Sequence, residues 1–315
     1  MPAKDNPPAL LDVRWPERLK DTDVRLALVA YAGVVILFAP LLVWALQQTV
    51  AREQLHLAFV ILAGAGIWLI VDNREKLRLR LELDDPSRWL LIGAYTSFVL
   101  GWVMQAFAPP GWNLVQLALL LAGPCLALGS LIRFLLGAKA ARASQGLLIA
   151  FFAYLALALV LPVYDWPLRR IAGEWSLWLL QTLGVTSRLG TVPGGQPMLL
   201  LEVEGRLFNV AQECNGFGLL SASILLTLLL LIYRRVDWTD RALLMAAAIT
   251  GALAANALRI LVIVLVAPLL PHSQYQLMHD TVGIVIFYAA LGLLWWFIRG
   301  FGRSPDAPPN APAPA

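Results

Sequence analysis

Long runs of apolar residues alternate with short polar segments along most of the chain. A helix needs about 20 apolar residues to cross the hydrocarbon core of a bilayer. We expect transmembrane helices at Leu26–Leu46, His56–Val71, Trp89–Phe107, Leu114–Leu136, Gly146–Val163, Phe217–Tyr233, Ala242–Pro268 and Val282–Ile298. The pattern therefore predicts an all-α integral membrane protein with about eight transmembrane helices.

The composition favours lipid over water as the surroundings of this chain. Of its 315 residues, 59% are hydrophobic and 14% are charged, whereas soluble domains carry about 25% charged residues. The net charge is +4, but the basic residues stand in short clusters between the apolar runs. This distribution is typical of membrane topology, so we expect membrane lipid as a partner and no nucleic acid.

The basic residues are divided unevenly between the two sides that eight alternating spans create. Eighteen Lys and Arg residues fall on the side of both termini and five on the other side, while Arg259 lies inside the seventh run. Since cytoplasmic loops are enriched in Lys and Arg, we predict a multi-pass protein of the bacterial inner membrane with both termini in the cytoplasm. Residues 1–25 are then a cytoplasmic N-terminal segment, 26–300 the transmembrane domain, and 301–315 a disordered, Pro- and Ala-rich cytoplasmic tail.

One predicted outer segment, about 164–213, is much longer than the others. In its first part Trp175, Leu179 and Leu183 recur at a spacing of four, which indicates an amphipathic helix in the outer membrane interface. Its second part alternates in hydrophobicity around a turn at Glu204-Gly205, which indicates a short β-hairpin. The hairpin leads directly into the sixth apolar run.

Polar residues that could take part in catalysis are concentrated where the last three apolar runs reach the outer side. An Arg inside a membrane helix costs on the order of 2.5–3.5 kcal/mol and is tolerated when it faces a bundle interior. Asn256 precedes Arg259 by three residues and shares its helical face. The full set of candidate residues is Glu213, Cys214, Asn215, Gly216, Asn256, Arg259, His279 and Asp280.

Cys214, Arg259 and His279 are the candidate catalytic residues. Cys214 stands where a helix begins, and a helix N-terminus or a nearby cation favours the reactive thiolate. His279 can carry the proton as general base and acid. Arg259 can donate hydrogen bonds to a tetrahedral oxyanion.

The remaining candidates support these three. Gly216 lets a substrate approach the backbone closely. Asp280 or Glu213 can orient the imidazole, and the sequence does not choose between them. Cys125 lies inside an apolar run and is interpreted as a small buried hydrophobe. No Cys and His spacing matches a closed zinc site, so we expect no metal and no cofactor.

At these motifs the chain resembles the exosortase/archaeosortase family of multi-spanning membrane enzymes. The resemblance is carried by Cys214-Asn215-Gly216, by Asn256-Ala-Leu-Arg259 and by His279-Asp-Thr-Val-Gly283 in this order. Family members often have Ser after the Cys, where this chain has Asn215, and a polar or basic residue shortly after the Gly, where it has Phe217-Gly218. These departures concern the subtype and the substrate motif.

The resemblance implies a membrane cysteine transpeptidase-protease with its active site on the periplasmic side. Its substrates are membrane-anchored exported proteins with C-terminal sorting signals, each a short motif such as Pro-Glu-Pro, a membrane helix and a basic tail. Cleavage would be followed by transfer to an unknown surface acceptor. Two alternatives stay open: a hydrolytic membrane cysteine protease, and a non-enzymatic subunit for exopolysaccharide assembly or export.

Overall fold

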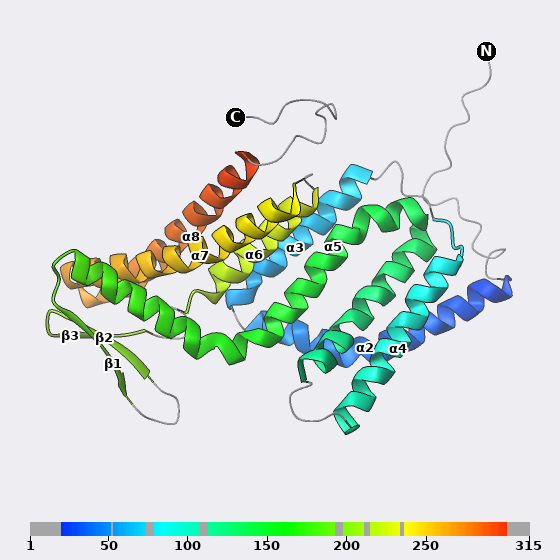
Figure 1. Cartoon of the computed structure of the whole chain (residues 1–315), viewed down its shortest axis with the longest axis horizontal. Coiled ribbons are helices and arrows are strands. Elements are labelled where there is room, and N and C mark those ends of the chain that lie inside the picture. The colour runs from blue at the N-terminus through cyan, green and yellow to red at the C-terminus, as the bar shows by residue number, and fades with distance from the viewer. Residues whose placement is uncertain are drawn as a thin grey trace, which may run out of the picture. The chain divides into compact units, whose positions relative to one another are not determined.

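The computed structural model describes residues 20–51, 53–73, 79–107, 113–192, 198–210, 215–233 and 236–300 (Figure 1). Most of these residues are helical. The helices are α2 (Thr22–Ala51), α3 (Glu53–Asn73), α4 (Asp85–Phe107), α5 (Asn113–Thr182), α6 (Phe217–Tyr233), α7 (Trp238–Val266) and α8 (Tyr275–Gly300). The predicted tail and most of the predicted N-terminal segment lie outside the described residues.

Six of the described helices are long and apolar enough to cross a membrane, and α6 is a shorter apolar helix. Their outward side chains are largely apolar. In the most apolar stretch of α8, for example, only 6% of the residues are buried within the protein. Water-soluble proteins rarely expose continuous apolar surface of this extent, whereas lipid accommodates it. The prediction of a helical multi-pass membrane protein is confirmed, and the count of eight spans stays a prediction.

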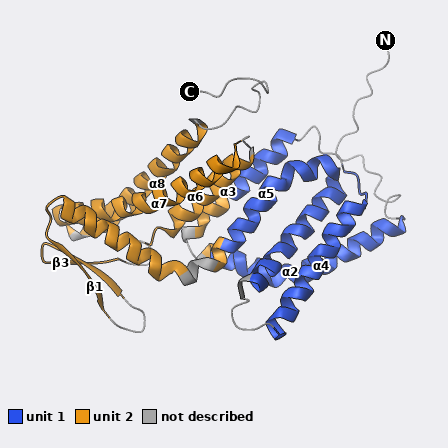
Figure 2. Cartoon of the chain, viewed as in Figure 1, with its two compact units in different colours: residues 1–48, 62–156 blue, residues 49–61, 157–315 orange. Residues whose placement is uncertain are grey.

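The described residues divide into two compact units (Figure 2). Unit 1 comprises residues 1–48 and 62–156, and unit 2 comprises residues 49–61 and 157–315. The division falls within α2, α3 and α5, each of which contributes residues to both units. All candidate site residues belong to unit 2.

Element α5 consists of two helices that meet at a kink at Gly137, where the pattern predicted two spans, a polar loop and a separate interfacial helix. Only Gly137 leaves helical geometry, at φ 82° and ψ 177°, and Figure 1 shows that α5 changes direction. The carbonyls of Phe134 and Leu135 accept hydrogen bonds from the backbone N–H groups of Glu82 and Arg80. The predicted polar loop between the two spans is reduced to this kink, since the chain is helical again directly after Gly137, and two of the carbonyls left free before the kink have backbone donors from a neighbouring segment.

A small polar network holds α4 to α5 in unit 1. Asp84 accepts a hydrogen bond from the Ser87 N–H (3.0 Å), which caps α4, and forms an ion pair with Arg133 (2.6 Å). The hydrogen bond from Arg133 favours the charged carboxylate and lowers the pKa of Asp84 to about 2. The Ser130 hydroxyl contacts the Tyr31 hydroxyl and donates to the Ser87 carbonyl, both at 2.7 Å. The ion pair therefore stays charged at neutral pH.

Unit 2 contains a three-stranded antiparallel sheet of β1 (Ser187–Val192), β2 (Met198–Val203) and β3 (Arg206–Asn209), in that order. Strands β2 and β3 form the predicted hairpin. Its turn residues Glu204 (φ 49°) and Gly205 (φ 79°) are both left-handed, as tight two-residue hairpins require. The sequence missed β1, because its side chains are mostly exposed and lack an alternating pattern.

The sheet packs against the C-terminal part of α5 and against α7. Leu199 and Leu201 of β2 are buried, and they join Ile260 and Val264 of α7 in one apolar cluster. The α5 residue Gly173 faces β2 closely, since a Cβ there would lie 2.9 Å from the Leu199 side chain. The sheet thereby forms one wall of the region that contains the candidate site.

A helix is present where the amphipathic helix was predicted, as the last part of α5, and the face that packs on the protein lies beside the predicted apolar stripe. Ala172, Ser176 and Leu180 are buried, whereas Leu183 is 61% exposed and Trp175 is 36% exposed. Both stripes have a helical spacing of four, so the sequence alone cannot show which of them faces the protein. The Trp175, Leu179 and Leu183 stripe is therefore not the main face that packs on the protein, and its place in the membrane interface stays a prediction.

Helices α7 and α8 differ from their predicted spans at the ends near the site. Helix α7 ends at Val266, and a 3₁₀ turn at Ala267–Leu269 contains Pro268, where proline cannot continue the helix. Helix α8 begins at Tyr275, well before its predicted start at Val282. His279 therefore lies inside α8 rather than in front of it.

Candidate active site

The described candidate residues come from the turn before α6, from the middle of α7 and from the first turns of α8. Asn215, Gly216, Asn256, Arg259, His279 and Asp280 are among them. Cys214 and Glu213 lie outside the described residues. The geometry of the site is therefore built from the neighbours of Cys214 in the sequence and from the two helices that carry the other motifs.

The turn before α6 is fixed by the side chain of Asn215, which is buried (2% exposed). Its Oδ1 accepts a hydrogen bond from the Phe217 N–H at 2.9 Å, a side-chain cap of the kind that begins helices. Its Nδ2 donates to Asp165 Oδ1 at 2.6 Å. Gly216 follows in a left-handed conformation, with φ 74°, that few other residues adopt readily.

Asn256 and Arg259 of α7 each fill the space beside a glycine of a neighbouring helix segment. A Cβ on Gly216 would lie 2.5 Å from Asn256 Cγ, and a Cβ on Gly283 would lie 3.0 Å from Arg259 Nη2. Gly283 follows His279 by four residues, so both lie on the same face of α8. These contacts bring the three predicted motifs to one region of unit 2. The first motif is represented by Gly216, the second by Asn256 and Arg259, and the third by the face of α8 that carries His279.

His279 is close to one of its two predicted carboxylate partners. Its Nδ1 lies 3.2 Å from Asp280 Oδ1, and its side chain is 16% exposed, compared with 54% for that of Asp280. The Asp280 carboxylate also accepts hydrogen bonds from Gln276 Nε2 at 3.1 and 3.2 Å. The Tyr275 ring lies near the imidazole, with 6.2 Å between ring centroids. These neighbours surround the ring within the first turns of α8.

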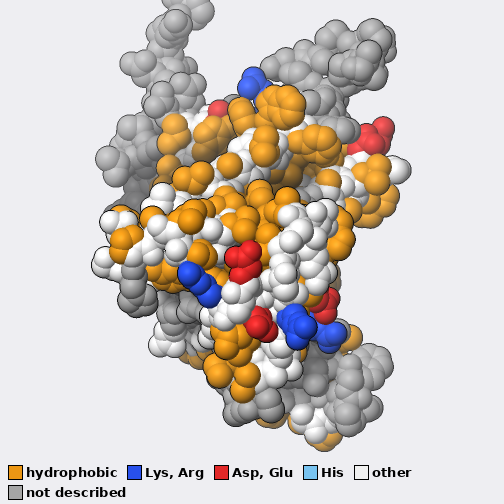
Figure 3. Space-filling view, turned by 90° about the vertical axis from the view of Figure 1, so that its left-hand side faces the viewer, with side chains coloured by type: hydrophobic (Ala, Val, Ile, Leu, Met, Phe, Trp, Pro, Cys, Tyr) orange, Lys and Arg blue, Asp and Glu red, His pale blue; other side chains and the backbone are white. Residues whose placement is uncertain are grey.

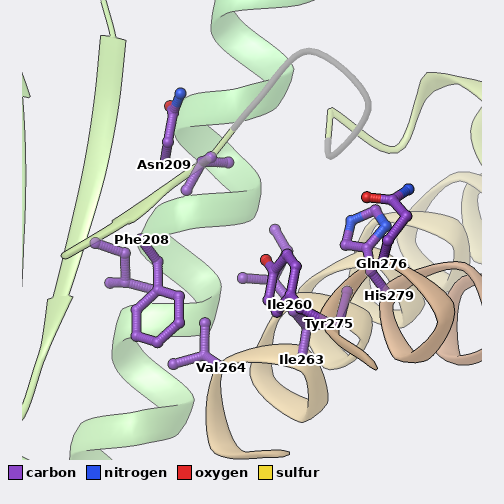
Figure 4. A pocket seen from close by; sticks show the side chains of 10 residues that line it. Phe208, Asn209, Ile260, Ile263, Val264, Tyr275, Gln276 and His279 are labelled. Carbon is purple, nitrogen blue, oxygen red and sulfur yellow. The ribbon is translucent and has the colours of Figure 1, made fainter. Parts of the chain in front are cut away.

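A cavity of about 380 Å³ opens beside His279, within the range of about 300–1,000 Å³ typical of ligand pockets. The sheet and α7 supply apolar walls, while the polar groups come mainly from α8. Figure 4 shows Phe208 and Val264 on one side and Gln276 and His279 on the other. The cavity is lined by Leu201, Phe208, Asn209, Val210, Ile260, Ile263, Val264, Tyr275, Gln276 and His279.

Sequence reasoning missed two charged residues that join this site. Asp165 and Arg169 of α5 form an ion pair at 2.6 Å with side chains that are 17% and 9% exposed, and Asp165 also binds Asn215. The sequence places Arg169 only among the five basic residues on the side opposite the termini. The i,i+4 spacing of opposite charges, next to Trp166, is the signal that could have found them, although Arg170 and Glu174 share this spacing.

The exposed surface of the molecule has a different character from the site. The face shown in Figure 3 carries acidic and basic side chains close to one another among apolar side chains. In unit 2 such exposed charges include Arg170 and Glu174, which pair at 2.7 Å on α5. Among the described residues, no three His, Cys, Asp or Glu side chains gather as metal ligands would.

Comparison with known proteins adds one finding to this geometry. A family model described as transmembrane exosortase matches residues 49–296, most of the chain and all three motifs. The chain belongs to the exosortase family. No curated protein and no solved structure matches it. The predicted resemblance is confirmed, and the exosortase family is generally one of cysteine proteases and transpeptidases.

Gly283 of this exosortase offers a test of the contact between α7 and α8. We expect Gly283→Ala to lower the rate of substrate processing about 10-fold, since the new methyl group would lie 3.0–3.1 Å from the Arg259 guanidinium and a small displacement of a group that positions the substrate or the chemistry lowers the rate. Its thermal stability should change little, because the guanidinium is the flexible end of a side chain. Processing in membranes and the unfolding temperature in detergent are the measurements.

Gly292→Ala is the matched control, because Gly292 lies in the same helix and a Cβ there would meet nothing within 4 Å. Its processing rate should stay within about 2-fold of the wild type. Equal rates for the two variants would contradict a role for the α7–α8 contact.

Proposed function

We propose that this exosortase is a membrane cysteine transpeptidase-protease that cleaves the C-terminal sorting signals of exported proteins. The observation that supports this proposal best is a pair of close contacts, one between Gly216 and Asn256 and one between Arg259 and Gly283. Gly283 lies about one helical turn from His279. Cys214 precedes Gly216 by two residues in the sequence. Family membership supports the cysteine chemistry.

In the proposed reaction His279 takes the proton of Cys214, and the thiolate attacks the carbonyl carbon of the scissile peptide bond. Arg259 donates hydrogen bonds to the resulting oxyanion, where charge develops in the transition state. The C–N bond then breaks, and the imidazolium of His279 gives its proton to the leaving amine. The thioester passes its acyl group to the acceptor, whose proton returns to His279.

Asp280 is the described residue suited to orient His279. With a proton on Nδ1 the imidazole donates to Asp280 Oδ1, which leaves Nε2 as the basic nitrogen. Glu213, the other candidate, lies outside the described residues. The apolar cavity beside the ring supports a substrate segment bound next to the imidazole.

The membrane arrangement belongs to the same proposal. In this proposal the two parts of α5 on either side of Gly137, the short helix α6 and the other five long helices serve as the eight spans. The distribution of Lys and Arg supports cytoplasmic termini. The active site then lies on the periplasmic side of the inner membrane, where membrane-anchored substrates display their C-terminal signals.

The proposal is tested by replacing the nucleophile. In cells that export a protein with a short motif such as Pro-Glu-Pro, a membrane helix and a basic C-terminal tail, we expect Cys214→Ala to reduce its processing by more than about 1,000-fold. The physical reason is that no other group forms the acyl-enzyme. Substrate processing is followed by the change in mass, and insertion by the amount of full-length protein in membranes.

Cys125→Ala is the matched control, because it replaces the other cysteine of the chain in unit 1. Its processing should equal that of the wild type. Normal processing by Cys214→Ala would contradict the enzyme proposal and favour an exopolysaccharide assembly or export subunit. The new C-terminus separates the two enzymatic forms: an attached lipid or glycan identifies transfer, and a free carboxylate identifies hydrolysis.

A further inference from the structure

We propose that Asp165 and Arg169 of α5 are positioning residues for the site, which hold the turn at Asn215 and Gly216 in the geometry that the reaction needs. This inference rests on the proposed function and extends it to a part of the chain outside the three motifs. Neither residue is assigned contact with the reacting atoms.

The two residues reach the turn through a continuous series of hydrogen bonds. Arg169 Nη2 donates to Asp165 Oδ2 at 2.6 Å, and Asn215 Nδ2 donates to Asp165 Oδ1 at 2.6 Å. The Phe217 N–H in turn donates to Asn215 Oδ1 at 2.9 Å. Because both ends of the Asn215 amide are bound, its orientation is fixed from two sides.

The ion pair is placed where charges are costly. The Asn215 residue is 2% exposed, and the side chains of Arg169 and Asp165 are 9% and 17% exposed. The Arg169 guanidinium also lies 5.5 Å from the centre of the Trp166 ring. Removing an ion pair from water often costs as much as the pairing returns. Added stability alone is therefore a weak reason for this pair, and control of geometry is a stronger one.

The same helix carries a comparable pair that serves as a reference. Arg170 and Glu174 have the same i,i+4 spacing and a distance of 2.7 Å, but their side chains are 66% and 48% exposed. Exposed ion pairs of this kind contribute little to the stability of the folded protein. The difference between the two pairs isolates the connection to Asn215 from the presence of an ion pair in α5.

The turn that Asp165 holds is coupled to the rest of the site. Gly216 follows Asn215 and packs directly on Asn256, with only 2.5 Å between Asn256 Cγ and the position of an added Cβ. Cys214 is joined to Asn215 by one peptide bond. A shift of the Asn215 side chain therefore moves both the packing on α7 and the attachment point of the proposed nucleophile.

An exchange of the two partners tests this inference in the full-length protein. Asn215→Asp places two carboxylates against each other, and Asp165→Asn removes the charge that Arg169 faces. The double variant Asp165→Asn/Asn215→Asp regains an amide-to-carboxylate hydrogen bond with its direction reversed, and it keeps acceptors for both Arg169 and the Phe217 N–H. All variants are made in the Cys125→Ala background, so that Cys214 is the single thiol.

Two readouts are taken from membranes with equal amounts of inserted protein. We expect substrate processing to fall about 100-fold in Asn215→Asp, since a misplacement of about 1 Å costs that much, and about 10-fold in Asp165→Asn. The double variant should recover to within about 5-fold of the parent, and Glu174→Gln should stay within about 2-fold. The rate at which a small maleimide alkylates Cys214, measured across pH, should differ from that of the parent most in Asn215→Asp and less in Asp165→Asn. It should differ least in the double variant and in Glu174→Gln.

The outcomes separate this inference from the proposed function. If the parent processes substrate and both single variants process it within about 2-fold, the positioning role is overturned and the enzyme remains. If neither the parent nor any variant processes substrate but the alkylation rates follow the expected order, the enzyme proposal fails and the positioning of Cys214 stands. Loss without recovery in an inserted double variant, or an equal loss in Glu174→Gln, overturns the positioning role.

Discussion

Replacing Arg259 with Met is expected to lower the processing rate by about 100- to 1,000-fold, the usual cost of removing one oxyanion donor. Met keeps an unbranched apolar side chain and removes both the charge and the guanidinium group that lies beside Gly283. The amount of inserted protein should not fall, because an uncharged residue is cheaper than Arg in a membrane helix. Single-turnover processing in membranes measures the chemical step separately from substrate binding.

Two further variants define what Arg259 supplies. Arg259→Lys keeps the positive charge but loses the planar fork of donors, so we expect partial activity between that of the wild type and that of Arg259→Met. Arg241→Met is the control on the same helix. Its Nε donates to the Val236 carbonyl at the other end of α7, so its processing should be normal. Full activity in Arg259→Met would exclude Arg259 from the chemistry.

Gly216→Ala is expected to abolish processing, with a loss of about 100-fold or more. Two effects combine at this position. The left-handed φ of 74° is unfavourable for a residue with a Cβ, and the added atom would lie 2.5 Å from Asn256 Cγ. Either Asn256 or the turn has to move, and the turn carries Asn215 and the chain to Cys214. Processing rate and unfolding temperature in detergent are both measured.

Gly205→Ala separates these two effects. Gly205 has nearly the same backbone conformation, with φ 79°, but a Cβ there would meet nothing within 4 Å. It should show the backbone cost alone, as a modest loss of stability of about 1 kcal/mol, with processing close to normal. Equal losses in the two variants would mean that the contact with Asn256 has no part in the function.

The sequence by itself determined the class of protein and its family. In lipid every backbone polar group must find a partner within the chain, so long apolar runs have essentially one structure available, the helix. This local rule is why the apolar runs predicted the helices of the structure, with α6 at Phe217–Tyr233. The order of the Cys, Arg and His motifs likewise indicates the exosortase family, to which the chain belongs.

Local patterns failed where partners far apart in the chain decide the structure. At Gly137, where α5 leaves helical geometry, backbone donors from Arg80 and Glu82 bind the carbonyls of Leu135 and Phe134. The helical spacing in α5 allowed two stripes, and the sheet together with the Ser176 hydrogen bond to the Ala257 carbonyl selected the one that is buried. Strand β1 likewise forms by pairing with β2, not by an alternation of its own.

The features of the candidate site likewise fall into those that the sequence shows and those that only the tertiary structure shows. Arg259 and His279 were evident from the sequence, because a charge in a membrane helix is costly and a conspicuous polar group among apolar residues is easily seen. The connection of Asn215 to Asp165, 50 residues earlier in the chain, and the packing of Asn256 on Gly216 have no local signature. Only the tertiary structure decides them, because contacts between distant segments depend on how whole helices pack.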